Sequence, residues 1–267
     1  MTGVGLWGLA LALTLAAAAY QRRTGPTHPM RGEFTLAGER FTYALPRTHG
    51  GAGGQEVVVT APAGATGEAV WRHYPSNHPW QRLPMAPDSG LRVILPHLPP
   101  AGKMEYYLRI TAGAETVELP GAGGCAVIRY KGAVPAVVLI PHVLCMFGAM
   151  LLANRAGMEA IRPEGGISAL TVAVMTALVL GGLIFGPLVQ YYAFGAFWTG
   201  FPFGHDLTDN KILLAFIAWL FPFVRVLRRR PSRAWVIVAA AVMFAVFMIP
   251  HSLLGSELQW DTLPAPG

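Results

Sequence analysis

Six ionisable side chains of metal-binding type stand within or beside long apolar runs. They are His142, His205, Asp206, Asp209, His251 and Glu257. Ionisable groups at membrane depth cost several kcal/mol unless they are paired or functional, so these positions indicate a polar site. Imidazole and carboxylate groups suit zinc, copper or iron, and a histidine pair such as His142 and His251 can hold a b-type haem. We therefore predict one outer-leaflet pocket for these six residues, and the sequence leaves open whether it takes a metal ion or haem.

The spacing of these residues is not itself a ligand motif. The chain has no His-Glu-x-x-His sequence, no Cys-x-x-Cys sequence and no pair of histidines four positions apart. Structural alternatives also stay open: His142 could bond a neighbouring helix, and Glu257 could be a solvated tail residue. For Asp209 we favour the role of N-cap of the helix that follows it, a role that Asp206 could also take.

Catalytic machinery of the familiar kinds is missing from the sequence. It holds no phosphate-binding Walker loop, no Gly-x-Ser-x-Gly elbow and no Ser and His pair on adjacent apolar runs. The apolar runs at residues 133–153, 167–189 and 234–250 contain no Asp, Glu, Lys or Arg, which disfavours an ion-coupled transporter with central carboxylates. The question of an enzyme stays open, and these absences favour the answer no.

Composition places most of the chain in a membrane. Of its 267 residues, 53% are apolar and 13% are charged, whereas a soluble domain has about 25% charged residues. The net charge is +6, and the tight basic cluster Arg228 to Arg230 lies between two apolar runs. Positive-inside bias explains this cluster more simply than a nucleic-acid surface, so no nucleic-acid partner is expected.

Apolar runs predict about five transmembrane helices in a membrane α-helical bundle. The first lies within residues 1–20 and has no preceding Lys or Arg, which favours a retained anchor over a cleaved signal peptide. The others form a four-helix bundle within residues 133–250, at residues 133–153, 167–189, 212–224 and 234–250. The run at 212–224 is short, so its helix should begin near Asp209. The aromatic segment 190–211 should lie as a loop on the outer interface, and residues 251–267 form a tail.

The positions of the arginines predict which loops face the cytoplasm. Arg155, Arg162 and the group from Arg225 to Arg233 lie in two loops on one side, whereas the opposite short loop has only Lys211. The positive-inside rule makes the first side cytoplasmic. The N-terminus is then cytoplasmic in a bacterial-type inner membrane, and residues 31–130, 190–211 and 251–267 are extracytoplasmic, although Arg22 and Arg23 favour the reverse.

Residues 31–130 show a different pattern, with seven or eight short alternating runs separated by Gly and Pro. This pattern is typical of an all-β sandwich. The stretch Leu98–Ile110 resembles the strand that follows a tyrosine corner in immunoglobulin-like and fibronectin type III modules, and Trp71 would then be the core tryptophan. Exposed Trp80 is either a contact for a partner or glycan, or an aromatic packed on the sandwich. We assign no role to His73, His78 and His97.

Two functions are compatible with this organisation. The favoured one is an accessory or scaffolding subunit of a larger membrane complex, which docks partners through its outward β-sandwich. Its partners would be membrane lipids and other membrane or periplasmic subunits. The alternative is a metal- or haem-binding membrane protein, for electron transfer or metal supply, that uses His142, His251 and residues 205–211.

Overall fold

The computed structural model describes residues 3–121, 123–250, 255, 257–258 and 260–262. The chain forms two compact units, which are described separately below. The helical unit is built from Met1–Pro26 and Val134–Ser256, and the β unit from Thr27–Ala133 and Glu257–Gly267. The segment from Glu257 onwards therefore belongs to the β unit.

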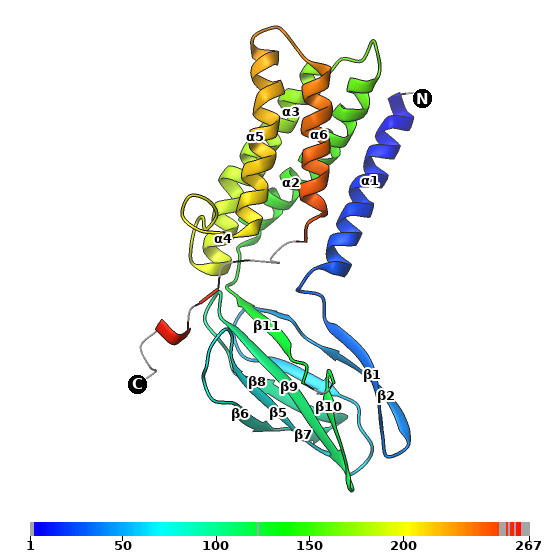
Figure 1. The fold of residues 1–267 in the computed structure, drawn as a ribbon, viewed down its shortest axis with the longest axis vertical. Coiled ribbons are helices and arrows are strands. Elements are labelled where there is room, and N and C mark those ends of the chain that lie inside the picture. Colours follow the sequence, from blue (N-terminus) through cyan, green and yellow to red (C-terminus); the bar gives the residue numbers. More distant parts are fainter. Residues whose placement is uncertain (1–2, 122, 251–254, 256, 259, 263–267) are drawn as a thin grey trace. The chain divides into compact units, whose positions relative to one another are not determined.

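The helical unit is drawn in Figure 1. Its helices are α1 (Gly3–Thr24), α2 (Ala136–Ile161), α3 (Ser168–Leu178), the π-helical segment η1 (Val179–Phe185), α4 (Gly186–Phe194), α5 (Leu207–Leu227) and α6 (Arg233–Met248). Among the described residues, four helices are long and apolar enough to cross a membrane, and α3, η1 and α4 count as one of them. Helix α6, expected as a fifth span, has only 16 residues and is about 24 Å long at 1.5 Å per residue.

Small side chains allow the helices to approach closely. Ala149, Ala153, Ala156 and Ala160 are buried on one face of α2, which packs against α6. A Cβ atom added to Gly157 of α2 would lie 2.8 Å from the Cβ of Ala240 in α6. Close backbone approach at small residues is the usual way in which membrane helices associate. The core of this unit therefore depends on small residues as well as on large ones such as Trp219, which is fully buried.

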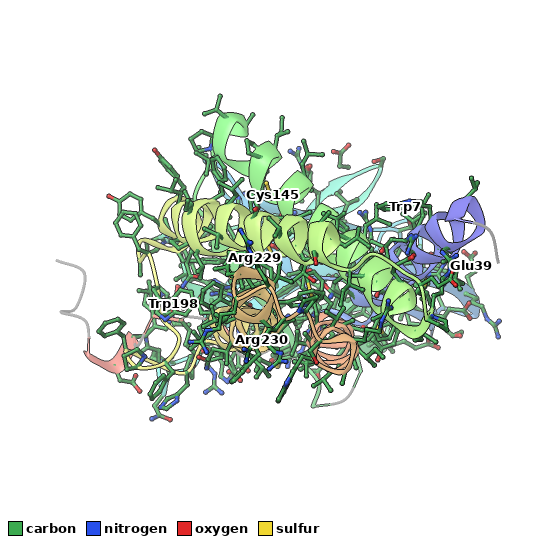
Figure 2. The ribbon with its side chains drawn as sticks, turned by 90° about the horizontal axis from the view of Figure 1, so that it is seen from above. Trp7, Glu39, Cys145, Trp198, Arg229 and Arg230 are labelled. Atoms are coloured by element: carbon green, nitrogen blue, oxygen red, sulfur yellow. The ribbon has the colours of Figure 1, made fainter. Side chains whose placement is uncertain are left out.

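Helix α1 packs against α2 with the opposite chain direction. Near the middle of α1, the Thr14 Oγ1 atom accepts a hydrogen bond from Asn154 Nδ2 of α2, over 3.1 Å. Near the start of α1, the ring of Trp7 lies 5.5 Å from the guanidinium carbon of Arg155, late in α2. The start of α1 thus lies at the same end of the helical unit as the end of α2. Arg229 and Arg230, labelled with Trp7 in Figure 2, follow α5 and are exposed.

The described residues of the β unit form three sheets. Their strands are β1 (Met30–Leu36), β2 (Glu39–Leu45), β3 (Thr48–Gly50), β4 (Gln55–Val59), β5 (Thr66–His73), β6 (Gln81–Pro84), β7 (Ala86–Asp88), β8 (Gly90–Leu95), β9 (Lys103–Ala112), β10 (Glu115–Leu119) and β11 (Ala126–Lys131). The orders are β1-β2, β4-β8-β7 and β3-β11-β9-β5-β6, with β10 also paired to β9. All pairs are antiparallel except β11 with β3.

One hydrophobic core receives side chains from all three sheets. Strand β9 shows how: Met104, Tyr106, Leu108 and Ile110 are fully buried, while the residues between them face outward. This is the period of two that a half-buried strand requires. Trp71, expected in the core, is 6% exposed there. The hydroxyl of Tyr106 donates to the carbonyl of Pro46 over 2.9 Å.

The structure corrects several predicted boundaries near the aromatic segment. The expected loop 190–211 is shorter, because α4 continues to Phe194 and α5 already begins at Leu207. The N-cap of α5 is Asp206, whose Oδ1 accepts from the backbone N–H groups of Thr208 at 2.7 Å and Asp209 at 3.4 Å. The N-cap role favoured for Asp209 is therefore wrong. Because Asp206 caps the helix, the carboxylate of Asp209 is available for the loop.

Candidate functional site

Asp209 organises the loop at residues 195–206 from inside the helical unit. Its Oδ2 atom accepts from the backbone N–H groups of Thr199 at 2.7 Å and Gly200 at 3.0 Å. The same oxygen accepts from Gln190 Nε2 of α4 at 2.9 Å and from the Thr199 hydroxyl at 3.4 Å. Asp209 is 6% exposed, and a buried carboxylate needs such donors. It therefore joins α4, the loop and α5.

The same loop presents aromatic side chains outward. Gly200 fits only as glycine, because an added Cβ would lie 2.6 Å from Asp209 Cβ and 2.8 Å from Asn210 Oδ1. Asn210 Oδ1 also accepts from the backbone N–H of Phe201 at 2.7 Å. Held in this way, Phe201 and Phe203 are 69% and 82% exposed. Trp198, labelled in Figure 2, precedes them in the loop.

Lys211 joins the start of α5 to the end of α6. Its Nζ donates to the carbonyl of Ile249 over 2.7 Å, and the residue is 5% exposed. A buried ammonium is tolerated only when it is paired or hydrogen-bonded. The polar groups at this end of the helical unit thus bind the chain's own backbone and amides, which is a structural use of their hydrogen-bonding capacity.

His142 lies where α2 meets the π-helical segment η1. Its Nδ1 is 2.9 Å from the carbonyl oxygen of Gly181, so Nδ1 carries the proton and donates. The same carbonyl accepts from the backbone N–H of Gly186. This arrangement leaves Nε2 as the ring nitrogen able to accept a bond or bind a metal. Single π-helical turns are frequent at functional sites.

The six predicted site residues are only partly brought together. Asp206 and Asp209 lie side by side at the start of α5, and His205 beside them is exposed. Glu257 belongs to the β unit, where its Oε2 lies 2.5 Å from Lys103 Nζ. His251 lies outside the described residues. Within the described part of the chain, no group of three His, Cys, Asp or Glu side chains is arranged to hold a metal ion.

The β unit has a histidine pair to which the sequence assigned no role. The Nδ1 atoms of His73 at the end of β5 and His78 lie 3.0 Å apart. The ring of Trp260 stacks on His73 with centroids 4.0 Å apart, and Asp261 Oδ1 is 3.8 Å from His78 Nε2. Burial, and then the neighbouring His78, lower the pKa of His73 below its ordinary value. The spacing His-x4-His is the sequence feature that could have pointed to the pair.

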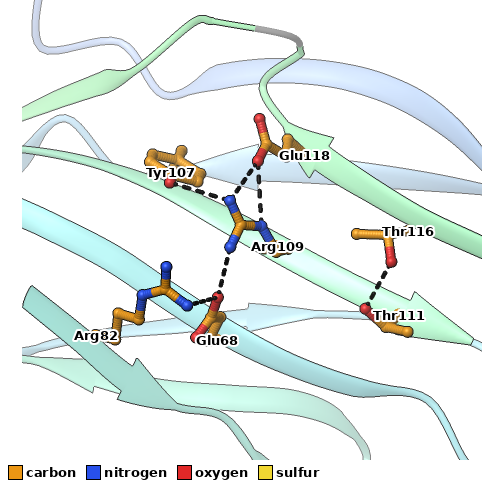
Figure 3. A network of polar contacts seen from close by, with 7 residues as sticks. All are labelled: Glu68, Arg82, Tyr107, Arg109, Thr111, Thr116 and Glu118. Atoms are coloured by element: carbon orange, nitrogen blue, oxygen red, sulfur yellow. Dashed lines mark hydrogen bonds and ion pairs between the residues drawn. The ribbon is translucent and has the colours of Figure 1, made fainter. Parts of the chain in front are cut away.

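The outward face of the β5-β9 sheet carries a network of charged and aromatic side chains, part of which is shown in Figure 3. Arg109 on β9 donates to Glu118 at 2.9 Å and to Glu68 at 3.0 Å. Trp80 lies on the same face: Arg72 is 4.5 Å above its ring, and Tyr107 meets it edge-on at 5.5 Å. Trp80 is nevertheless 39% exposed. It is therefore both packed on the sheet and accessible.

Comparison with protein-family models, curated proteins and solved structures finds no match for this chain.

Cys125 provides a test of the β unit's electrostatics. Burial, and then the charge of Glu105, raise the pKa of its thiol above the ordinary value. Because the thiolate is the reactive form, a raised pKa means less thiolate at a given pH. In a Cys145→Ser chain we expect iodoacetamide to alkylate Cys125 more slowly at pH 8 than an ordinary exposed cysteine. The rate should still increase above pH 9.

The control for this labelling is an exposed cysteine introduced as Ser89→Cys in a chain that lacks Cys125 and Cys145. Ser89 is exposed in the same unit. Equal rates for the two cysteines at pH 8 would contradict the raised pKa.

Proposed function

We propose that this chain is a polytopic integral membrane protein that serves as an accessory or scaffolding subunit of a larger membrane complex. Its β unit, proposed to be an immunoglobulin- or fibronectin-like sandwich, docks a partner on the extracytoplasmic side. Helix α6 is proposed as the fifth span. The N-terminus and the Arg-rich loops are cytoplasmic, in a bacterial-type inner membrane, as the positive-inside rule requires.

The observation that carries this proposal is exposed Trp80, which lies against the half-buried side chains of Arg72 and Tyr107 on the β5-β9 sheet. Trp, Tyr and Arg are the residue types that dominate binding energy in protein interfaces. Here the tryptophan is already held by two neighbours, so little side-chain freedom is lost on docking. Several ion pairs around it, such as Arg72 with Glu105 at 2.5 Å, keep the rest of the face polar.

The polar cluster of the helical unit supports the same interpretation. Asp209 uses one oxygen to accept four hydrogen bonds, and Lys211 is bound to a backbone carbonyl. Groups used in this way fix the conformation of a loop. They present Phe201 and Phe203 to lipid or to a neighbouring membrane subunit, as expected of an aromatic belt.

The proposal is tested by native mass spectrometry of the protein extracted gently from its own membrane. We expect at least one other protein in fixed stoichiometry, and we expect Trp80→Ala to reduce the bound fraction at least tenfold, as for a hot-spot residue. The matched control is Ile94→Ala, since Ile94 is 55% exposed on β8, in the β4-β8-β7 sheet. A lone wild-type chain, or equal loss with Ile94→Ala, contradicts docking on this face.

One observation favours the alternative of a metal- or haem-binding protein. The carbonyl of Gly181 fixes the ring of His142 through Nδ1, and such orientation by a backbone carbonyl is common for metal-ligating histidines. Binding would then use Nε2, with His251 as the partner proposed from the sequence. For this function, His142→Ala should remove a metal or haem that accompanies the purified protein.

A further inference from the structure

The histidine pair of the β unit has the features of a small chelating site. His73 and His78 are joined by a short turn in which the hydroxyl of Ser76 donates to the carbonyl of His73 at 2.7 Å. The same hydroxyl oxygen accepts from the backbone N–H of His78 at 3.3 Å. The turn is thus hydrogen-bonded at both ends, and it directs the two Nδ1 atoms at each other over 3.0 Å.

We propose that His73 and His78 bind a divalent first-row transition-metal ion through both Nδ1 atoms. This site uses none of the six residues that the sequence predicts as metal ligands, and it does not depend on the function proposed above. Imidazole nitrogen suits zinc, copper and nickel ions.

The distance between the two nitrogens fits such an ion. Zinc binds imidazole nitrogen at about 2.0–2.1 Å, which places two ligands of a tetrahedral site about 3.3 Å apart. The observed distance of 3.0 Å between the two Nδ1 atoms needs to increase by only a few tenths of an ångström. The ring planes of His73 and His78 are inclined at 82°, so both rings can approach one ion without a clash between their edges.

Metal binding requires no net change in the number of protons on the two imidazole rings. A hydrogen bond between two Nδ1 atoms needs one N–H group and one lone pair. Asp261 lies 3.8 Å from Nε2 of His78 and favours the proton there, so His78 accepts and His73 donates. When the ion binds, the proton of His73 leaves Nδ1 and one from solvent joins Nε2. Both Nδ1 lone pairs then face the metal, and the net number of protons is unchanged.

Neighbouring residues supply the outer surroundings of the ion. A carboxylate beside the second nitrogen of a ligating histidine, as Asp261 is beside His78, helps to orient the ring. The indole of Trp260 covers one face of His73. Both belong to the segment that Glu257 ties to Lys103. Metal binding would therefore also fasten this C-terminal segment to the strands of the β unit.

Two protein ligands leave positions for water or for a donor from solution. Among the residues that the structure describes, no third His, Cys, Asp or Glu completes a metal-binding group with them. Sites with open positions exchange their ions, whereas structural zinc sites are closed by four protein ligands. We therefore expect reversible binding of one ion.

The test is a titration of the full-length protein in detergent, treated with chelator, with Zn²⁺ as the probe and calorimetry as the readout. We expect a component of one equivalent that His73→Gln and His78→Gln each weaken at least tenfold. Asp261→Asn, which acts only through His78, should weaken it about tenfold. The matched control is His97→Gln, because His97 lies in the same unit with its Nδ1 on the carbonyl of Gly53.

Zinc binding that is absent, or that the variants of His73 and His78 leave unchanged, would overturn the proposal. A measurement without variants covers the case in which a variant does not fold. Zinc should protect His73 and His78 of the wild-type protein from modification by diethylpyrocarbonate, mapped by peptide mass spectrometry, and should leave His97 unprotected. Equal modification of all three with and without zinc also overturns the proposal.

Discussion

Asp209→Ala is expected to destabilise the helical unit by roughly 2–6 kcal/mol, because the backbone N–H groups of Thr199 and Gly200 both lose this acceptor and each buried donor left without its acceptor costs about 1–3 kcal/mol. The change removes the one oxygen that accepts from Gln190, Thr199 and Gly200. The loop should open, since its backbone is tied to α5 mainly through this carboxylate and Asn210. Thermal unfolding in detergent should show a melting temperature lower by on the order of 10 °C. Limited proteolysis should cut within residues 195–206.

Asp209→Asn separates the effect of the negative charge of Asp209 from the effect of its acceptor oxygen. The amide retains one oxygen for the N–H groups of Thr199 and Gly200, but it loses the charge that strengthens these bonds. We therefore expect a loss of stability of about half that of the alanine variant. Glu164→Ala is the control, because Glu164 is an exposed carboxylate in another loop. An Asp209→Ala protein as stable as the control would show that the carboxylate does not hold the loop.

The local patterns that the sequence predicted well are those set by hydrophobicity. Apolar runs predicted membrane-length helices, and α1, α2, α5 and the continuous helix Ser168–Phe194 have that length and composition. Alternation predicted strands such as β9, whose buried and outward residues follow the period of two. Both patterns depend on a residue's close neighbours in the chain, which is why a single sequence carries them.

The sequence could not predict which residues the fold brings into contact. Asp206 and Asp209 are three positions apart and equally suited to cap a helix, and only the folded loop decides that Asp209 faces Thr199 and Gly200. His73 and Trp260 are far apart in the chain, yet their rings stack. Tertiary contacts of this kind have no period and no local propensity, so they leave no pattern in one sequence.

The arginines show how one sequence feature can have two physical causes. From the sequence alone, all the arginines of the two Arg-rich loops indicate the cytoplasmic side. In the structure, however, Arg155 pairs with Glu159, and Arg233 donates to backbone carbonyls such as those of Arg162 at 2.5 Å and Pro163 at 2.8 Å. Arg228, Arg229 and Arg230 are exposed. Positive-inside bias is our proposed reason for the exposed group, whereas Arg155 and Arg233 also have a structural role.

The second large effect is expected from Glu159 in α2. The side chains of Glu159 and Arg155 are each 9% exposed and form an ion pair, and Arg162 Nη1 lies 3.3 Å from the same carboxylate. Removing one partner of a buried pair leaves an uncompensated charge and costs about 3–5 kcal/mol. Glu159→Ala should therefore lower the free energy of unfolding by about 3–5 kcal/mol. Thermal unfolding in detergent measures this loss. Arg155 should also lose its fixed position beside Trp7, so α1 should be cut from the unit more readily by protease.

A double variant tests the cause of this loss. Glu159→Leu with Arg155→Met replaces the pair by apolar side chains of similar size, which is often neutral or stabilising for a buried pair. We expect the double variant to be more stable than Glu159→Leu alone, because the unpaired arginine is the source of the destabilisation. Arg228→Met is the matched control, since it removes an exposed arginine and should change stability by less than about 0.5 kcal/mol. If the double variant is no more stable than Glu159→Leu alone, the loss arises from packing around Glu159 and not from the buried charge of Arg155.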